Sequence, residues 1–182
     1  MRGSMGIWFL DDPSHWRDET SLSVGSNNST GIVARVAIES DAGPRLRIDI
    51  PAALDCVCFQ DVRLIGSHAY IGYGSRFFVI DVELLSFDEY AMDGYFCNLY
   101  SAHEITSSGD VFTVLATSAS ELLAFDHYGA LVWKTSALGV DGVVVHAVSG
   151  NMLFGEGEWD PPGGWRPFTV SEITGEIIHK GP

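Results

Sequence analysis

The hydrophobic positions of this chain come in short runs separated by Gly, Ser, Asp and Pro, and they seldom show the period of an amphipathic helix. Short apolar runs bounded by turn-forming residues are typical of β-strands. Residues 32–38 and 46–50 have this pattern, and residues 40–44 between them have the composition of a turn. Residues 11–30 are polar and predict mostly loop, with a short helix near 14–19. The pattern therefore predicts an all-β protein that begins with a hairpin.

A repeat begins near residue 60. Three segments end alike, and each leads through a short turn into an apolar strand, then a second strand, then a fourth segment that is clearest in the last two copies. The similar segments are 62–66, 103–109 and 144–150; the apolar strands are 69–72, 111–115 and 152–155; the next strands are 77–81, 122–126 and 167–171; the fourth segments are 129–133 and 175–178. Matching positions lie roughly 41 to 45 residues apart, which is the period of a four-stranded propeller blade.

This period predicts propeller-like repeats of four-stranded antiparallel sheets, about three full blades plus the N-terminal hairpin. Residues 1–4 have the composition of a cloning leader before Met5. We expect 5–182 to form a single all-β domain, with an N-terminal loop and hairpin over 5–58 and three blade-like repeats over 59–182. A closed four-bladed ring, an open stack of sheets and a homodimer that covers an exposed edge all remain open, because a long uncovered edge favours aggregation.

The middle repeat carries a resemblance to a known architecture. Residues 121–133 read ELLAFDHYGALVW, an apolar strand, Ala-x-Asp, a Gly turn, and an apolar strand that ends in Trp. This segment resembles the blade of quinoprotein-like and WD40-like β-propellers, in which the Asp and Gly make the tight turn and the Trp, here Trp133, packs between blades. Residues 171–176 are similar more loosely, and 79–81 keep only the strand and its Asp. The resemblance implies blade architecture and carries over no catalytic residue.

Charge and composition narrow the range of possible functions. The formal net charge is −14, which argues against binding of a nucleic-acid backbone and favours a basic protein partner, although an acidic surface also serves solubility alone. No apolar run is as long as a membrane span and no signal peptide is recognisable, so we expect a cytoplasmic protein. Cys56, Cys58 and Cys97 are an odd set without zinc-like spacing, which favours buried thiols over a metal site.

Motifs for catalysis are missing from the sequence. There is no Gly-x-Ser-x-Gly elbow and no phosphate-binding loop, and His103-Glu104 lacks the second His of a zinc protease motif. His15 lies near Asp11, Asp12 and Asp18, a pattern better explained by a solvated acidic loop than by a metal site. For His146 we expect a hydrogen-bonded structural role in a core or channel. We therefore predict no catalytic residues, no cofactor and no metal.

Residues 155–167, GEGEWDPPGGWRP, are the most unusual stretch. They fall between the second and third strands of the last repeat, where we predict an inserted loop whose Pro-Pro and Gly-Gly pairs exclude regular sheet. Glu156 and Glu158 share one face if the strand continues to that point. Trp159 and Trp165 either cover a blade edge or form an exposed platform of the kind that dominates protein interfaces.

These observations predict a non-catalytic, acidic protein-binding module. By analogy with small acidic proteins that lack catalytic motifs, we expect an inhibitor or immunity-type protein that neutralises a basic bacterial toxin or a similar partner. The predicted contact residues are Glu156, Glu158, Trp159, Asp160 and Trp165. The alternative is a carbohydrate-binding or glycoside-acting protein that uses the same Trp and acid residues. A fragment of a longer propeller is a third possibility.

Overall fold

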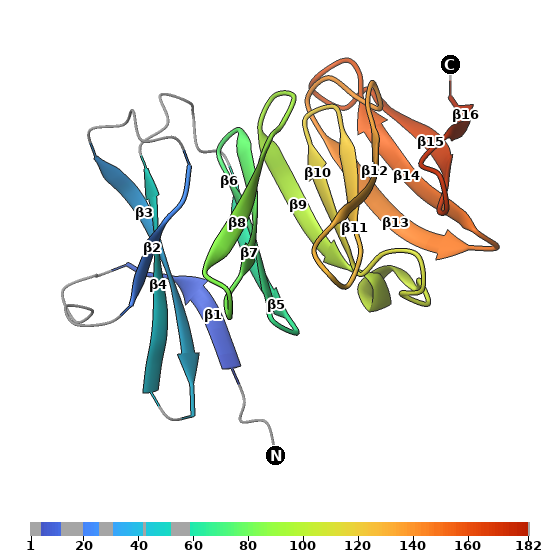
Figure 1. Ribbon diagram of the computed structural model, residues 1–182. Helices are drawn as coiled ribbons and strands as arrows, with labels where there is room; N and C mark the ends of the chain where they lie inside the picture. Colours follow the sequence, from blue (N-terminus) through green and yellow to red (C-terminus); the bar gives the residue numbers. More distant parts are fainter. Residues whose placement is uncertain (1–4, 12–19, 26–30, 42, 52–58, 182) are drawn as a thin grey trace. The chain divides into compact units, whose positions relative to one another are not determined.

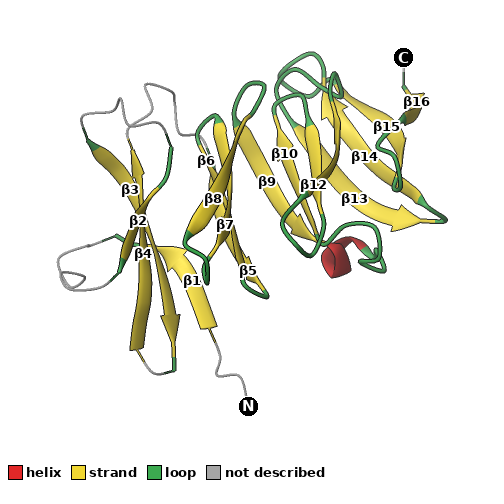
Figure 2. Ribbon diagram, in the orientation of Figure 1, coloured by secondary structure: helices red, strands yellow, loops and turns green. Residues whose placement is uncertain are grey.

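The computed structural model describes residues 5–11, 20–25, 31–41, 43–51 and 59–181, which form four four-stranded β-sheets and one short 3-10 helix (Figures 1 and 2). The strands of the first two sheets are β1 Met5–Phe9, β2 Ser21–Ser23, β3 Ile32–Ser40, β4 Gly43–Pro51, β5 Gln60–Ile65, β6 His68–Tyr73, β7 Arg76–Asp81 and β8 Ser86–Ala91. Those of the third and fourth sheets are β9 Phe96–Ser101, β10 Val114–Ser118, β11 Leu122–Phe125, β12 Leu131–Thr135, β13 Val143–Ser149, β14 Met152–Glu158, β15 Trp165–Ser171 and β16 Ile177–Lys180. The predicted all-β fold class is confirmed.

The last three sheets are the three predicted repeats. In each of them the strands follow one another in chain order, from β5 to β8, from β9 to β12 and from β13 to β16. Neighbouring strands of the third and fourth sheets pair antiparallel. Four-stranded meanders of this kind are the propeller-like blades that the spacing predicts.

The predicted N-terminal hairpin is present as β3 and β4, but it forms the centre of the first sheet, which has four strands in the order β1-β3-β4-β2. β1 pairs antiparallel with β3, and β2 pairs parallel with β4, so this sheet is mixed. The short runs of β1 and β2 show too little alternation to be recognised in the sequence. The short helix predicted near 14–19 and the pair Cys56 and Cys58 lie outside the described residues.

The chain divides into two compact units. The first consists of Met1–Asp55, Val62–Ile71 and Phe78–Tyr90, and the second consists of Cys56–Asp61, Gly72–Phe77 and Ala91–Pro182. The second unit contains the third and fourth sheets, and the candidate site described below lies entirely within it.

The first strand of the third sheet differs from the prediction. It is β9, and residues 103–109 contain no strand; instead the 3-10 helix η2, Ala102–Ile105, follows β9 directly. The backbone N–H of Ser101 donates to Glu104 Oε2 at 2.7 Å, which satisfies a donor at the start of this helical turn. Thr106 ends the turn with a left-handed φ of 62°. The apolar residues Ala102 and Ile105 thus belong to a helical turn, and β10 starts only at Val114.

The third and fourth sheets share one hydrophobic core. Phe112, Leu115 and Leu122 from the third sheet and its connections are buried with Leu153 and Phe168 from the fourth. Trp133 borders this core with its ring edge-on to Phe112, at a centroid separation of 6.3 Å. Trp133 Nε1 also donates to the carbonyl oxygen of Glu172, in the β15–β16 turn. Trp133, in the middle of β12, therefore packs between two sheets, as the blade resemblance implies.

Candidate functional site

The hairpin of β14 and β15 is longer than predicted. Its strands pair from Met152 opposite Ser171 to Glu158 opposite Trp165, so only residues 159–164 form the connecting turn. Gly155 and Gly157, at the start of the stretch predicted as a loop, are part of the ladder. A β-carbon on Gly157 would collide with the carbonyl group of Leu138, so glycine at this position permits the β12–β13 connection to lie against the strand.

One face of this hairpin, which we call the outer face, combines acidic and apolar side chains. It consists of Met152, Phe154, Glu156 and Glu158 on β14 together with Trp165 on β15, because strand residues alternate and directly paired residues share a face. The intervening residues of β14 are buried. Trp165 is 40% exposed, and Met152 and Phe154 are exposed as well. The sequence expectation that Glu156 and Glu158 share a face agrees with this register.

Glu158 and Trp165 lie together beside Gly142. A β-carbon on Gly142 would lie 3.2 Å from Trp165 Cη2 and 4.0 Å from Glu158 Oε2. The backbone of Glu158 also fixes this connection, since its N–H donates to the Gly142 carbonyl at 2.9 Å and its carbonyl accepts from Val140 N at 2.8 Å. The carboxylate and the indole are thus held next to each other by regular sheet and by the β12–β13 connection.

Glu156 pairs with His146 across the sheet. His146 Nε2 lies 3.2 Å from Glu156 Oε2, and the two side chains are 55% and 42% exposed. The β13–β14 register shifts between Val145 and Ala147, which leaves His146 as the extra residue of a bulge. His146 therefore has a side-chain partner, as expected, but its placement in a core or channel is wrong, because the bulge leaves its ring at the surface beside Glu156.

The tip of the hairpin is ordered by its own hydrogen bonds. Trp159 N donates to the Gly164 carbonyl at 3.0 Å, and Gly164 N donates to the Asp160 carbonyl at 3.0 Å. Gly163 N donates to Glu158 Oε1 at 2.8 Å, so the same carboxylate that adjoins Trp165 also holds the tip. Asp160 is exposed at this turn. The predicted irregular tip is present, although it is shorter than expected.

Trp159 has surroundings different from those of Trp165. Its side chain is half-buried, and Lys180 Nζ lies over the ring at 3.9 Å from the centroid. The same ammonium group donates to the carbonyl oxygen of Ala137 at 2.7 Å. The two tryptophans therefore do not form one platform: Trp165 lies on the outer face, and Trp159 lines an open depression.

This depression has a volume of about 460 Å³ and is lined by residues of four connections. Figure 1 shows these connections at one end of the third and fourth sheets. The lining comes from the β8–β9, β10–β11 and β12–β13 connections and from the β14–β15 turn. The residues are Asp93, Gly94, Ala119, Ser120, Ser136, Ala137, Gly139, Val140 and Trp159. Asp93 is the one residue of this described lining with a formal charge, and of the five predicted contact residues only Trp159 takes part.

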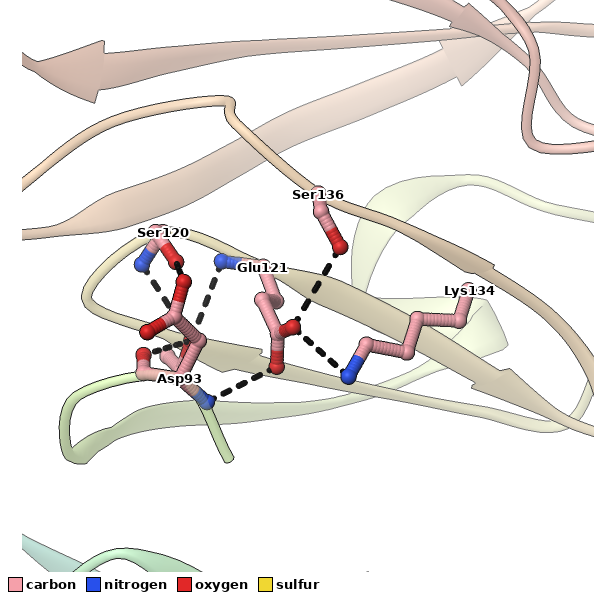
Figure 3. Close-up of polar contacts among 6 residues, drawn as sticks. Asp93, Ser120, Glu121, Lys134 and Ser136 are labelled. Atoms are coloured by element: carbon pink, nitrogen blue, oxygen red, sulfur yellow. Dashed lines mark hydrogen bonds and ion pairs between the residues drawn. The ribbon is translucent and has the colours of Figure 1, made fainter. Parts of the chain in front are cut away.

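A buried carboxylate supports the wall of the depression (Figure 3). Glu121 is 4% exposed, and its carboxylate accepts from the Asp93 backbone N–H at 2.9 Å and pairs with Lys134 Nζ at 2.6 Å. Ser136 Oγ also donates to Glu121, at 3.3 Å. Asp93 is fixed in turn, because its Oδ2 accepts from Ser120 Oγ at 2.8 Å. Sequence reasoning missed this network, since its members come from β12 and from three separate connections, with no characteristic spacing.

Within the described residues, no group of three or more His, Cys, Asp and Glu side chains is arranged to hold a metal ion. The group of His15, Asp12 and Asp18 lies outside the described residues. Among the helices of the described part of the chain, none has the length and apolar character needed to cross a membrane.

Comparison with known proteins gives a distant structural likeness. The chain matches no protein-family model and no curated protein. Among solved structures it is similar to the WD40 domain of Pan2 from Neurospora crassa, with 10% sequence identity and a TM-score of 0.46. The match covers 81% of this chain and 47% of that domain, so this chain spans about half the length of the solved structure. The four four-stranded sheets give the protein a propeller-like fold, and these comparisons indicate no specific family within it.

Proposed function

We propose that this protein is a non-catalytic binding module that captures a basic protein partner through the outer face of the β14–β15 hairpin. The observation that carries this proposal is the pairing of Glu158 with the exposed Trp165, with Glu156 next along the same face. Tryptophan is prominent among the residues that dominate interface energies, and neighbouring carboxylates select for cationic groups on a partner.

The rigidity of the hairpin supports the same proposal. Both strands are paired over their full length, and the Glu158 carboxylate holds the tip through Gly163. Side chains on a preorganised surface lose less conformational entropy when a partner binds. Met152 and Phe154 extend the apolar part of the face beyond the acidic pair. The arrangement therefore offers an apolar anchor with acidic flanks.

The net charge of −14 suggests how a basic partner is attracted. A strong field of one sign speeds association with an oppositely charged protein, and added salt reduces the effect. An inhibitor or immunity-type protein that covers a basic toxin in the cytoplasm fits this chemistry. In such a complex the outer face covers a basic surface, and no reaction takes place on this chain.

The proposal is tested by affinity capture from a lysate of the source organism at low and high salt, followed by quantitative binding of the purified partner. Trp165→Ala should weaken binding by at least about 10-fold, and the double variant Glu156→Gln/Glu158→Gln should slow association and flatten its salt dependence. Tyr128→Ala and Asp110→Asn are the matched controls, because both residues are exposed and lie in other turns of the same unit. A basic partner whose binding is unaffected by the outer-face variants contradicts the proposed surface.

Carbohydrate binding is a second candidate, and the depression is the observation that favours it. Trp159, Ser120, Ser136 and Asp93 combine an aromatic ring with hydroxyl groups and a carboxylate, and such groups suit the C–H faces and hydroxyls of a sugar. A glycan screen with the wild-type protein and Trp159→Ala separates the two candidates. A glycan bound only when Trp159 is present, with no protein captured at either salt concentration, favours this second function.

A further inference from the structure

We infer that the depression beside Trp159 binds one basic side chain, of arginine or lysine, from the partner. The identity of the partner rests on the proposed function, whereas the chemistry of the depression stands on its own residues. This site is distinct from the outer face, and of the residues predicted from the sequence it uses only Trp159.

The first argument is the contact between Lys180 and Trp159. A cation over an indole face is attracted by the negative quadrupole of the ring, and tryptophan is the best of the aromatic side chains for this interaction. The ammonium of Lys180 lies 3.9 Å from the ring centroid, so the ring already holds a cation. The same ammonium donates a hydrogen bond to the Ala137 carbonyl. Lys180, from the last strand β16, therefore shows the chemistry that the site accepts, and a partner's side chain competes with it.

The second argument is the charge of Asp93. Its backbone N–H is bound by Glu121, its backbone carbonyl accepts from Ser118 Oγ at 2.9 Å, and its Oδ2 accepts from Ser120. The carboxylate is thus held in a fixed position. Within the described part of the chain, no ion pair involves Asp93, whereas the nearby Glu121 is neutralised by Lys134. A guanidinium or ammonium group from a partner would neutralise the Asp93 carboxylate and donate charge-assisted hydrogen bonds to it.

The third argument is the shape and the remaining lining. A volume of about 460 Å³ lies within the range of small-ligand pockets and is ample for one long side chain. Ala119, Ala137 and Val140 provide apolar surface for the methylene stem, while Ser120 and Ser136 provide hydroxyl oxygens for the polar head. Arginine and lysine need this combination, since they pack their stems on apolar surface and keep the charged head with polar groups.

The depression adjoins the outer face, because the β14–β15 hairpin contributes Trp159 to the first and carries the second. Val140, in the lining, donates its backbone N–H to the carbonyl of Glu158, whose side chain lies beside Trp165. The acidic residues Asp141 and Asp160 lie in the same connections, and Asp141 accepts from Tyr95 Oη at 2.7 Å. A basic partner on the outer face therefore has the depression within reach of a neighbouring side chain.

The test uses N-acetyl-arginine methylamide as the probe and the citrulline analogue as its neutral isostere, titrated into the full-length ¹⁵N-labelled protein. We expect the arginine probe to shift the NMR signals of the indole N–H of Trp159 and of the backbone amides of Gly94 and Ser120, while the citrulline probe causes no saturable shift.

Asp93→Asn should weaken the affinity for the arginine probe roughly 2- to 5-fold, because the amide keeps the bond from Ser120 but loses the charge. Lys180→Ala should raise the affinity for the arginine probe roughly 2- to 5-fold, because the Lys180 ammonium no longer occupies the face of the Trp159 ring. Asp110→Asn is the matched acidic control and should leave the affinity unchanged.

Three results would overturn this inference. The first is equal binding of the arginine and citrulline probes, and the second is an affinity that is insensitive to both Asp93→Asn and Lys180→Ala. The third is a sugar that shifts the Trp159 indole while the arginine probe does not. These results are separate from a failure of the proposed function. If Trp165→Ala abolishes binding of the partner and Asp93→Asn does not affect it, only the inference about the depression is rejected. If the arginine probe binds but no partner is recovered, only the proposed function is rejected.

Discussion

The indole N–H of Trp133 donates to the carbonyl oxygen of Glu172 at 2.9 Å. Glu172 is buried in the β15–β16 turn, and its Oε1 accepts from Ser107 Oγ at 2.6 Å. Glu172, in a turn of the fourth sheet, is therefore bound by two segments of the middle repeat. A β-carbon on Gly175 would lie 2.6 Å from the Trp133 ring, and the φ of Gly175 is 72°, so glycine is required at this turn both for space and for conformation.

Trp133→Phe should lower the free energy of unfolding by about 1–3 kcal/mol, because it removes the donor to Glu172 and part of a buried ring. Trp133→Ala should cost about 3–5 kcal/mol. Urea unfolding followed by circular dichroism measures both. Tyr128→Ala, in the exposed β11–β12 turn, should stay within about 0.5 kcal/mol of the wild type. Equal losses for Trp133→Phe and Tyr128→Ala would mean that the indole does not connect the two sheets.

Lys134→Met should destabilise the protein because it leaves Glu121 as a buried carboxylate without its cation. The loss should be about 1–3 kcal/mol, since Lys134 is partly exposed and Glu121 keeps hydrogen bonds from Asp93 and Ser136. The double variant Lys134→Met/Glu121→Gln should recover part of this loss, because glutamine is neutral and still accepts from Asp93. Thermal and urea unfolding of the two single variants and the double variant give the coupling free energy. Strict additivity would argue against the ion pair.

Gly157→Ala should disturb the candidate site from within the sheet. Its new methyl group meets the Leu138 carbonyl, so the β12–β13 connection that lines the depression must move. We expect a loss of about 1–3 kcal/mol in unfolding free energy and weaker binding of the arginine probe. Gly31→Ala is the control, because no atom lies within 4 Å of its added β-carbon. Unchanged stability with Gly157→Ala would show that the connection is free to relax.

The repeat could be predicted because strand, turn and blade chemistry are local. Asp126 illustrates this, since its Oδ1 accepts from Tyr128 N at 2.8 Å and from Ala130 N at 2.9 Å, the tight turn that the segment 121–133 implies. Where local signals are ambiguous, the prediction was wrong. Residues 102–105, after Ser101, form a helical turn, because Glu104 accepts a hydrogen bond from the backbone of Ser101, which no hydrophobic pattern reveals.

The candidate site was only partly predictable. The face shared by Glu156 and Glu158 follows from strand alternation, and the extension of the strands follows from the register. The separation of Trp159 from Trp165 depends on Lys180, and the depression depends on Asp93 and Ser136, which lie far away in the sequence. Contacts of this range are fixed by the packing of two sheets, and a single sequence contains no local signal for them.

Leu85→Gly should leave the protein as stable as the wild type or stabilise it by up to about 1 kcal/mol. Leu85 has a φ of 54° and is 42% exposed, in the β7–β8 turn at the position that Gly175 occupies in the β15–β16 turn. A left-handed leucine is strained, and glycine removes the strain at the cost of greater backbone entropy in the unfolded chain. Differential scanning calorimetry with Leu85→Ala as the control measures this, because alanine keeps the strain. A glycine variant less stable than the alanine variant contradicts the expectation.

Asp81 should make the free energy of unfolding of the first unit fall at acidic pH. The backbone N–H groups of Leu84 and Glu83 each donate to Asp81 Oδ1 at 2.9 Å, and with the nearby His68 they hold the pKa of this carboxyl below its ordinary value of 3.8, against a smaller opposing effect of burial. The contribution of Asp81 to stability is therefore fully present above the ordinary pKa and is lost as the pH falls through the lowered folded-state pKa.

In Asp81→Asn the amide oxygen still accepts from both N–H groups but does not titrate. The stability difference between the wild type and this variant should be constant near about pH 6 and should shrink below about pH 4, as measured by urea unfolding over a pH series. Asp110→Asn reports the general effect of removing one exposed carboxylate, and an identical pH profile for the two variants would show that the turn at Asp81 is not the source of the acid dependence.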